Sequence, residues 1–487
     1  MLEVHSSPVL WTATSILFLS SLLVLVLLIS LTPLGLDSLG MVKILKGIAA
    51  AVSDNLGSAI IKLEEHFWFY IPLGIIGIWR WLVWGVKKTG AALYRPISEG
   101  AFISRVSIIT PVYNENPETF KLALQSWVRN KPDEIIAVID ERDKDCIDVF
   151  QNYCKSKNGT HAKLIVTQKP GKRQALADGI LEAKGEIVAL VDSDTIWDNN
   201  IKQKLLQPFS DPVIGGVTPR NHPVKRQSIW EKMTDVFWDM RNYYDLPSQT
   251  AMGSALTCLT GRTSLYRREL LLPKLDVLLN EVLLGKRKES GEDKCLTRLV
   301  QKDGWKTYYQ SNAVIYSAAA HDFKTFITQR LRWTRNSHNS DLVSLLDGWA
   351  WRHPFLAFYM IDRFISTFTL FLGPIFLGVS IYYHQFTITL AILALWMVGR
   401  GIKILPHLRR RPDDILLVPV FVAVNFLMAA VKLYGLVTLR EQKWIREHYH
   451  LEKSTGYTHT LVAKIKDITL TTAIVFCLVF FVFYAFK

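Results

Sequence analysis

The sequence predicts an α/β domain with a mainly parallel sheet, embedded in a bundle of membrane-spanning helices. Long apolar runs gather towards both ends of the 487-residue chain, and residues 104–194 between them alternate strand-like and helix-like patterns. Such alternation is typical of a parallel sheet covered by helices on both faces. An apolar run of about 20 residues is long enough to cross a bilayer.

The apolar runs predict a multi-pass protein of the cell membrane. The uncharged run at 9–34 indicates a retained helix, because its core is longer than that of a signal peptide and no clear cleavage site follows. A second run, at 67–86, is rich in aromatic residues, as is usual near a membrane interface. Further runs follow the middle domain at 355–383, 386–399, 415–437 and 468–486.

The basic residues predict that the middle domain lies in the cytosol. The chain carries a net charge of +14, and basic stretches at 87–88, 407–414 and 440–453 mark the cytoplasmic side of the membrane. Both flanks of 415–437 are basic, so this run either lies at the interface, which we expect, or spans and places 440–453 outside. No basic stripe interleaved with aromatic residues is present, which disfavours nucleic acid as a partner.

Three regions follow from this pattern. Residues 1–100 hold the N-terminal membrane helices, 101–335 the cytosolic α/β domain, and 336–487 the C-terminal membrane region with a loop at 440–453. Aromatic and charged residues mix at 228–246 and 333–352, which predicts interfacial amphipathic helices. Ordinary core helices are the alternative interpretation of these two stretches.

The α/β domain is predicted element by element. Its first strand starts at residue 105. Helices are expected at 117–129, 143–156 and 171–184, and strands at 134–140, 162–168 and 186–192.

Polar residues follow each of these four strands. They are Tyr113, Asn114, Glu115, Asp140, Lys172, Arg173, Asp192 and Asp194. The carboxyl ends of parallel strands share one edge of a sheet, where ligands bind. Two carboxylates there can hold a hard divalent cation, and a Lys-Arg pair at a helix start suits a diphosphate.

Asp140 and Glu115 could hydrogen-bond a base or a ribose. The strand ends together predict a nucleotide-diphosphate site with a metal, although an isolated D-x-D is common and Asp140 could cap a turn. No dinucleotide-binding or P-loop motif is present.

Two later stretches add candidates for catalysis. Asp293, in "SGEDKCLTRLV" (290–300), could act as a general base, or Glu292 and Asp293 could stabilise a helix N-terminus. Gln329 and Arg332, three residues apart in "FITQRLRWTRNS" (326–337), share a helix face beside Trp333. A basic helix near the membrane is the other interpretation of the second stretch.

The motifs together resemble a known family. The series is similar to the D, D-x-D, [ED]-D and Q-x-x-R-W motifs of processive glycosyltransferase family 2 enzymes. In this sequence it consists of Asp140, the D-S-D at 192–194, the E-D at 292–293 and the Q-R-L-R-W at 329–333. These are the membrane synthases of hyaluronan, cellulose, chitin and related polymers. The resemblance covers residues 67–450 and is nearest to hyaluronan synthases, type 3 capsule synthases and the mannuronan polymerase.

Two stretches depart from the hyaluronan synthase pattern. Trp444-Ile445-Arg446 stands where those enzymes have W-G-T-R. Thr260-Gly261-Arg262 stands where they have S-G-P and looks like the mannuronan polymerase.

The resemblance implies a GT-A-like fold and a role for each matching residue. The donor nucleotide would be bound by Tyr113, Glu115, Asp140, Lys172, Arg173 and Asp192. Mg²⁺ or Mn²⁺ would be held by Asp192 and Asp194, and Asp293 would be the catalytic base. The diphosphate and the acceptor would be lined by Gln329, Arg332, Trp333, Cys258 and Gly261, and a gating loop would be formed by Trp444 and Arg446.

The predicted function is processive, inverting, metal-dependent transfer of sugar from a nucleotide-sugar donor to a nascent polysaccharide. The donor is expected to be a UDP-sugar. The polysaccharide is expected to cross the lipid bilayer as it grows. A non-processive transferase acting on a lipid or polyprenyl-phosphate acceptor is the alternative. A transporter or scaffold would leave the strand-end carboxylates unexplained. The sequence leaves open the sugar and the oligomeric state.

Overall fold

The computed structural model describes residues 75–98, 102–155, 160–169, 171–283 and 285–441, together with residues 469 and 472. The predicted run at 9–34, nearly all of 468–486, the first part of 67–86, and both Trp444 and Arg446 lie outside these ranges. The chain divides into two compact units. One contains Arg80–Gly373 and continues from Met397, and the other includes Pro374–Trp396.

An eight-stranded sheet forms the centre of the larger unit. The strand order is β3-β2-β1-β4-β7-β6-β10-β5. The strands are β1 (Val106–Val112), β2 (Glu134–Asp140), β3 (His161–Thr167), β4 (Ile187–Val191), β5 (Ile196–Trp197), β6 (Ile214–Pro223), β7 (Thr263–Arg267) and β10 (Lys306–Ser317). β1 to β4 are parallel to one another, β6 is parallel to β10, and β7 and β5 run antiparallel to their neighbours. The predicted mainly parallel sheet is confirmed.

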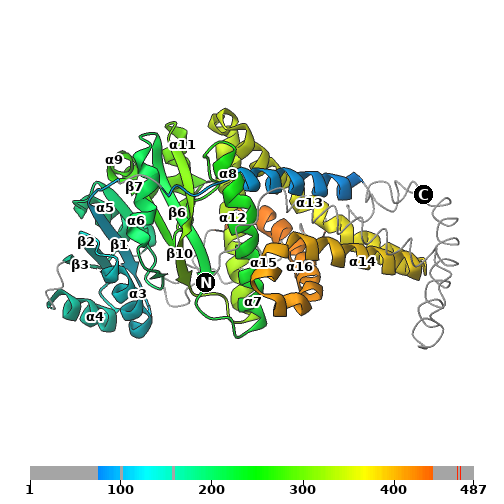
Figure 1. Ribbon diagram of the computed structural model, residues 1–487, viewed down its shortest axis with the longest axis horizontal. Helices are drawn as coiled ribbons and strands as arrows, with labels where there is room; N and C mark the ends of the chain where they lie inside the picture. The colour runs from blue at the N-terminus through cyan, green and yellow to red at the C-terminus, as the bar shows by residue number, and fades with distance from the viewer. Residues whose placement is uncertain are drawn as a thin grey trace. The chain divides into compact units, whose positions relative to one another are not determined.

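Helices cover the sheet (Figure 1). The helices are α3 (Pro117–Arg129), α4 (Lys144–Lys155), α5 (Lys172–Glu182), α6 (Ile201–Leu206), η1 (Gln207–Ser210), α7 (Ile229–Met240), the π-helix η2 (Arg241–Asp245), α8 (Leu246–Ala251), α9 (Arg268–Leu271), η3 (Leu272–Lys274), α10 (Leu275–Asn280), α11 (Glu292–Lys302), α12 (Phe323–Leu346), η4 (Trp349–Arg352), α13 (Pro354–Tyr382), α14 (Phe386–Lys403), α15 (Leu405–Arg410), η5 (Pro412–Leu416) and α16 (Leu417–Val437). Residues 75–93 are also helical. A two-stranded sheet joins β8 (Val282–Leu283) to β9 (Lys286–Arg287).

The strands are apolar along their length because both faces of the sheet are covered. Successive side chains of a strand point to opposite faces. Ile108 therefore packs in a core with Phe120 and Trp127 of α3, while Ile109 packs in a second core with Ile180 of α5. All of these side chains are fully buried.

Helix α3 has the bounds that the sequence predicts, because its start and end are set by local signals. The side chain of Asn116 accepts a hydrogen bond from the Thr119 amide at 3.0 Å, and Pro117 occupies the first helical position. Both features are typical of helix starts. Since α3 leads from β1 to the parallel strand β2, the chain returns to the same end of the sheet before each strand.

A helical layer adjoins the sheet domain within the larger unit. α12 packs against α11 on one side and α16 on another, and α7 contacts both α12 and α15 (Figure 1). Met233 of α7, Phe326 of α12 and Phe421 of α16 share one hydrophobic core. The stretch 228–246 predicted as a single amphipathic helix contains α7 and then a π-helix, and 333–352 contains the end of α12 and η4.

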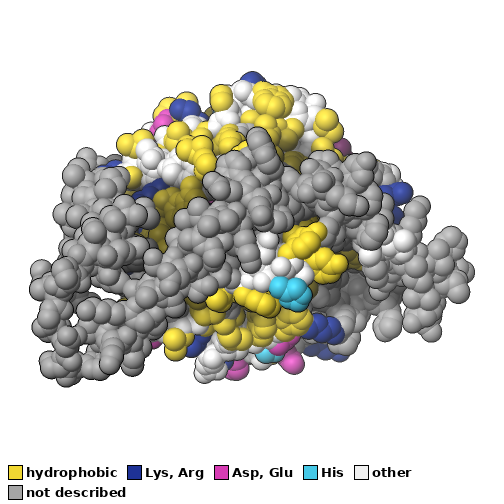
Figure 2. All heavy atoms as spheres, turned by 90° about the vertical axis from the view of Figure 1, so that its right-hand side faces the viewer, with side chains coloured by type: hydrophobic (Ala, Val, Ile, Leu, Met, Phe, Trp, Pro, Cys, Tyr) yellow, Lys and Arg dark blue, Asp and Glu magenta, His cyan; other side chains and the backbone are white. Residues whose placement is uncertain are grey.

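Two helical segments of the described residues are long and apolar enough to cross a membrane. They are Pro354–Tyr382, with a mean hydropathy of 1.9, and Pro412–Val437, with 2.3. Hydrophobic side chains make up much of the surface that the described residues present in Figure 2. The predicted runs at 355–383 and 415–437 therefore coincide with candidate spans, whereas the run at 386–399 gives a shorter helix, α14.

Candidate active site

A cavity of about 420 Å³ lies at the carboxyl ends of β1, β2, β3 and β4. The parallel order of these strands brings the polar residues that follow them to one edge. Most of the predicted site residues line this cavity: Tyr113, Glu115, Asp140, Lys172, Asp192, Asp194, Gly261, Asp293, Gln329, Arg332 and Trp333.

Lys172 forms ion pairs with two carboxylates of the cavity. Its Nζ lies 2.5 Å from Asp192 Oδ1 and 2.7 Å from Glu292 Oε1. Burial would lower the pKa of Lys172, but the two carboxylates outweigh burial and raise it above its usual value. Burial would likewise raise the pKa of Glu292, but the Lys172 ammonium outweighs burial and lowers it to about 2. Lys172 is thus a fixed positive charge in the cavity.

The side of the cavity formed by β1 and β2 carries groups suited to a nucleoside. Asp140 is buried and accepts two hydrogen bonds from Arg142, Nε to Oδ1 and Nη2 to Oδ2, both at 2.8 Å. The Arg142 guanidinium lies 5.6 Å from the centre of the Tyr113 ring. Glu115 Oε2 accepts a hydrogen bond from Ser193 Oγ at 2.8 Å, which links β1 to the D-S-D stretch.

Asp192 and Asp194 follow β4 in a tight turn. The Asp192 amide donates to the Arg262 carbonyl at 3.2 Å, and the Asp192 carbonyl accepts from the Thr195 amide at 3.1 Å. The intervening Ser193 is bound to Glu115, so the turn is anchored on both sides. Both carboxylates line the same cavity as Lys172 and supply the oxygen ligands that Mg²⁺ and Mn²⁺ prefer.

Asp293 lies in the first turn of α11, directly after Gly291 and Glu292. Its Oδ1 accepts a hydrogen bond from the Lys294 amide at 2.8 Å, and its Oδ2 accepts one from the Gly261 amide at 3.4 Å. The Gly261 backbone lies close to both Lys172 and Asp293, since a Cβ added to Gly261 would be 3.3 Å from Lys172 Nζ and 3.6 Å from Asp293 Cβ. A carboxylate with lone pairs to spare can accept a proton from a bound hydroxyl.

Helix α12 brings three of the Q-R-L-R-W residues to the cavity. Asp322 caps its N-terminus by accepting from the Thr325 amide at 2.9 Å, and this fixes where the helix begins. Gln329, Arg332 and Trp333 all line the cavity. Gln329 Oε1 is buried without a hydrogen-bond partner among the described residues, so an acceptor atom is available for a ligand.

Two predicted residues lie elsewhere. Arg173 turns away from the cavity and is buried, with Nη1 donating to the Leu278 carbonyl at 2.6 Å and Nη2 to Glu281 at 2.8 Å. Because successive helix residues are rotated by about 100°, Arg173 cannot share the direction of Lys172. Cys258 lines a second cavity that adjoins the first.

Some residues at the site were not predicted as site residues from the sequence. Asn336, one helical turn beyond Arg332, and Arg262, directly after Gly261, line the cavity. Arg142 lies outside the lining but donates a hydrogen bond to Asp140, a lining residue. The spacing of Asn336 from Gln329 and Arg332 was a usable signal, because residues at i, i+3 and i+7 share a helix face. Nothing in the local pattern distinguishes Arg142 from an exposed turn residue.

Comparison with known proteins identifies this domain. Residues 104–336 match the family model described as glycosyltransferase like family 2. The chain contains a glycosyltransferase family 2 domain. The α/β sheet and this match together confirm the GT-A-like fold and the prediction of a glycosyltransferase.

Two relatives in sequence extend the similarity beyond residues 104–336. The chain is 24% identical to a hyaluronan synthase of Streptococcus pyogenes serotype M3 over 399 residues, which cover 80% of this chain and 94% of the relative. It is 25% identical over 361 residues to a type 2 glycosyltransferase of Pyricularia oryzae, covering 70% and 73%. A solved mannosyltransferase from Pyrobaculum calidifontis, in complex with GDP-Man and Mn²⁺, aligns with a TM-score of 0.49 at 20% identity, covering 76% of this chain and 97% of that chain.

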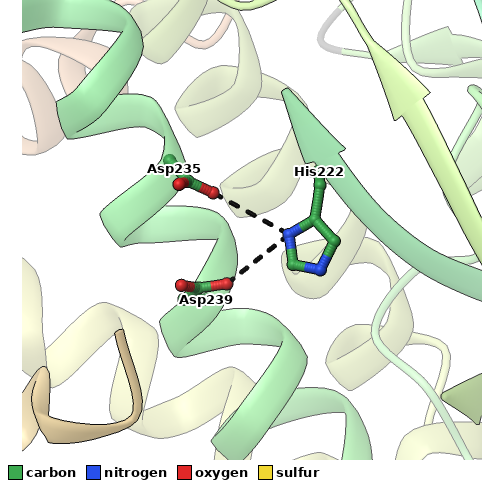
Figure 3. Close-up of side chains that lie close together, drawn as sticks. All are labelled: His222, Asp235 and Asp239. Carbon is green, nitrogen blue, oxygen red and sulfur yellow. Dashed lines mark ion pairs between the residues drawn. The ribbon is translucent and has the colours of Figure 1, made fainter. Parts of the chain in front are cut away.

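The glycosyltransferase has a second group of possible metal ligands away from the cavity. Figure 3 shows His222 of β6 facing Asp235 and Asp239 of α7, with its Nδ1 3.8 Å from Asp235 Oδ1 and 3.7 Å from Asp239 Oδ1. Both aspartates are buried, and the three residues are close enough to share one ion.

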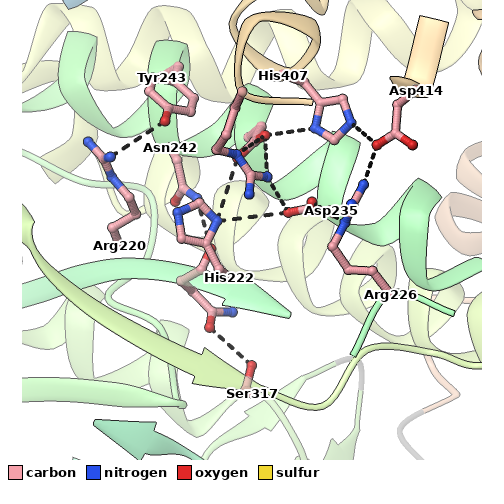
Figure 4. Close-up of polar contacts among 12 residues, drawn as sticks. Arg220, His222, Arg226, Asp235, Asn242, Tyr243, Ser317, His407 and Asp414 are labelled. Atoms are coloured by element: carbon pink, nitrogen blue, oxygen red, sulfur yellow. Dashed lines mark hydrogen bonds and ion pairs between the residues drawn. The ribbon is translucent and has the colours of Figure 1, made fainter. Parts of the chain in front are cut away.

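Arginine side chains already neutralise these aspartates. Arg410 Nη2 lies 2.7 Å from both Asp235 Oδ1 and Asp239 Oδ2. Arg226 lies beside Asp235 (Figure 4), with its Nε 2.6 Å from Asp235 Oδ2. His407 lies between Asp239 and a third aspartate, Asp414, with its ring nitrogens 2.7 and 3.0 Å from their oxygens.

Each ring nitrogen of His407 thus faces a carboxylate oxygen. The three aspartates pair with two arginines, Arg226 and Arg410. Because the arginines already bind these carboxylates, we interpret the group as a link between α7 and the segment that holds α15 and η5.

Replacing Arg410 by Ala should destabilise the glycosyltransferase. Asp235 and Asp239 are 0% and 1% exposed, and the change removes their shared cation. Breaking a buried ion pair by removing one partner typically lowers the free energy of unfolding by about 3 kcal/mol or more. Denaturation of the detergent-solubilised protein measures the free energy of unfolding, and Arg409→Ala, which changes an exposed arginine, is the matched control. Equal stability of the two variants would contradict the interpretation.

Proposed function

We propose that the protein transfers sugar from a nucleotide-sugar donor to a growing polysaccharide, processively and with inversion, and that the product leaves through the membrane region. The observation that carries this proposal is one cavity that combines two strand-end carboxylates, a fixed lysine, a candidate base and the Q-R-L-R-W residues. The similarity to a hyaluronan synthase over 80% of the chain supports a polysaccharide product.

The donor would lie along the strand ends. Asp140 and Glu115 would hydrogen-bond the nucleoside, next to the Tyr113 ring. Lys172 and Arg332 would bind the diphosphate, because both line the cavity and carry charge that a leaving diphosphate needs.

Asp192 and Asp194 fit a divalent cation, since both are oxygen ligands in the cavity that holds Lys172. Neutralising charge on the departing diphosphate is the chemistry that a bound Mg²⁺ or Mn²⁺ supplies.

Asp293 would act as the general base. An acceptor hydroxyl attacks the anomeric carbon of the donor sugar, the bond from that carbon to the diphosphate oxygen breaks, and the hydroxyl proton passes to the Asp293 carboxylate. Glu292 is engaged with Lys172 and is therefore unsuited to act as a nucleophile. A single displacement with one base inverts the anomeric configuration.

The route of the product is supported by a second cavity, of about 360 Å³, which shares Asp293 and Trp333 with the first. Its lining extends to Tyr359, Asp362 and Ser366 of α13 and to Lys432 of α16, which belong to the two candidate spans. An acceptor held there would lead from the base towards the membrane segments. We propose accordingly that the catalytic domain is cytosolic, within the boundaries 101–335, and that the flanking regions are multi-pass.

A donor screen with the purified full chain tests the proposal. UDP-glucuronic acid, UDP-N-acetylglucosamine, UDP-glucose and GDP-mannuronic acid are each supplied with Mg²⁺ or Mn²⁺, and nucleotide release and product size are measured. High-mass polymer from one or two donors is the expected result. Transfer of a single sugar to a lipid or polyprenyl phosphate would instead establish the non-processive alternative, and no release from any nucleotide sugar would reject both.

A further inference from the structure

The second cavity carries more positive charge than its own acids can neutralise. Its basic lining residues are Arg80, Lys87, Arg241, Arg262, Lys294, Arg330, Arg363 and Lys432, and its acidic ones are Asp245, Asp293 and Asp362. Uncompensated charge in a partly enclosed space is unfavourable unless an opposite charge enters.

Ion pairs account for only some of these cations. Arg80 and Lys87 pair with Asp362 at 2.7 and 3.7 Å, Lys87 also lies 3.3 Å from Asp245, and Arg363 pairs with Asp341 at 2.8 Å. The others have no carboxylate within ion-pair distance among the residues that the structure describes. They are Arg241, Arg262, Lys294, Arg330 and Lys432.

Arg262 is the most defined of these unpaired cations. Its guanidinium carbon lies 4.4 Å from the centre of the Trp238 ring and 5.2 Å from that of Trp333. The described part of the chain offers its guanidinium no hydrogen-bond acceptor, so its donors remain available. Stacking between aromatic rings holds the planar group in place, and its fork of N–H donors matches the two oxygens of a carboxylate.

Arg330 adds a second cation to the same aromatic group. It lies 5.2 Å from the centre of the Trp333 ring and 4.5 Å from that of Phe237. Its Nε and Nη2 atoms are buried without a hydrogen-bond partner among the described residues. Burial, together with the nearby charge of Arg262, lowers the pKa of Arg330 to about 9. An anion beside Trp333 would relieve both the repulsion and the missing hydrogen bonds.

We propose that Arg262 is a specificity residue that binds the carboxylate of an acidic sugar at the growing end of the acceptor. This inference rests on the proposed function, since it assigns the acceptor to the second cavity. The placement of Asp293 supports it, because Arg262 and Asp293 line both cavities and so both lie where the cavities meet. A sugar with its hydroxyl at Asp293 would have Arg262 within its reach.

The donor diphosphate is the competing ligand for Arg262. Lys172 and Arg332 line the first cavity and are absent from the lining of the second, so they belong to the donor side alone. Arg262 lies at the junction, with Trp238 of the second cavity against it and with the Asp192 and Asp194 carboxylates of the first cavity near enough to act on its charge. The donor and acceptor roles predict different results when the carboxylate is removed from the acceptor.

The test compares acceptors that differ in one carboxyl group. Tetrasaccharides with a glucuronate or a mannuronate at the non-reducing end, and the carboxyl-reduced form of each, are titrated into the full-length protein in detergent without donor. The wild type should bind one of the acids at least about tenfold more tightly than its reduced form. Arg262→Met should abolish that difference and leave the affinity for UDP or GDP with Mn²⁺ unchanged. Arg105→Met, which removes an exposed cation outside both cavities, should retain the difference.

Three results would overturn the proposal: equal binding of acid and reduced forms by the wild type, a preference that survives in Arg262→Met, or a loss of nucleotide affinity as large as the loss of acid binding. Thermal melting establishes whether Arg262→Met is folded. If Arg262→Met does not fold, Arg262→Lys takes its place in the test, because lysine keeps the positive charge but lacks the forked N–H donors of arginine. The binding measurements need no catalysis. A protein that selects the acid but releases no nucleotide would therefore reject the proposed function and leave this site standing.

Discussion

Replacing Asp293 by Asn is expected to reduce sugar transfer by about three orders of magnitude, because a positioned general base typically contributes a factor of this size. The amide has nearly the same shape as the carboxylate and can still accept the hydrogen bond that the Lys294 amide gives to Asp293 Oδ1. It cannot take up a proton from the acceptor hydroxyl. The rate of nucleotide release in the presence of donor and acceptor measures the effect.

Two further measurements make the Asp293 result specific. Nucleotide affinity should remain at the wild-type level in Asp293→Asn, since Asp140, Glu115 and Lys172 are retained. Asp276→Asn removes an exposed carboxylate of the nearby helix α10 and should transfer sugar normally. Polymerisation by Asp293→Asn at the wild-type rate would show that another group, or solvent, accepts the proton.

Replacing Asp194 by Asn is expected to weaken binding of the divalent cation and to lower transfer by about a hundredfold or more, because a metal ion that stabilises a leaving diphosphate contributes several kcal/mol. The change removes a charged oxygen ligand from the strand end, while the β4–β7 pairing that holds the turn is unaffected. Binding of Mn²⁺ in the presence of a nucleoside diphosphate, followed by electron paramagnetic resonance, provides a measurement that does not depend on turnover.

The matched control for this prediction is Asp198→Asn, an exposed aspartate four residues further along the chain. It should bind Mn²⁺ like the wild type. Chelation should abolish wild-type transfer, and added Mg²⁺ or Mn²⁺ should restore it. Unchanged Mn²⁺ affinity in Asp194→Asn would remove this residue from the metal site.

The positions of the strand-end residues were predictable because local patterns carry them. The apolar runs of β1, β2 and β4 and the cap of α3 are set by neighbouring residues in the chain, and the predicted bounds agree with the structure within a residue or two. Parallel pairing then places their carboxyl ends together, so Asp140, Asp192 and Asp194 were expected at one edge before any contact was known.

The direction of individual side chains was less predictable. Arg173 was expected to act with Lys172, but the rotation of the helix turns it into the packing between α5 and α10, where it binds Leu278 and Glu281. The bidentate pairing of Arg142 with Asp140 was also missed, because a two-residue separation across a turn gives no periodic signal.

The sequence by itself determined the class of the domain, the edge of the sheet where a nucleotide would bind, and the order of the motifs, because each depends on patterns within short stretches of chain. Only the tertiary structure decided which charges meet. Trp238, Arg262 and Trp333 are far apart in the chain and come together because α7 and α12 pack against one another. Contacts of this kind depend on how whole helices pack, so the unpaired cations of the second cavity became visible only in the folded chain.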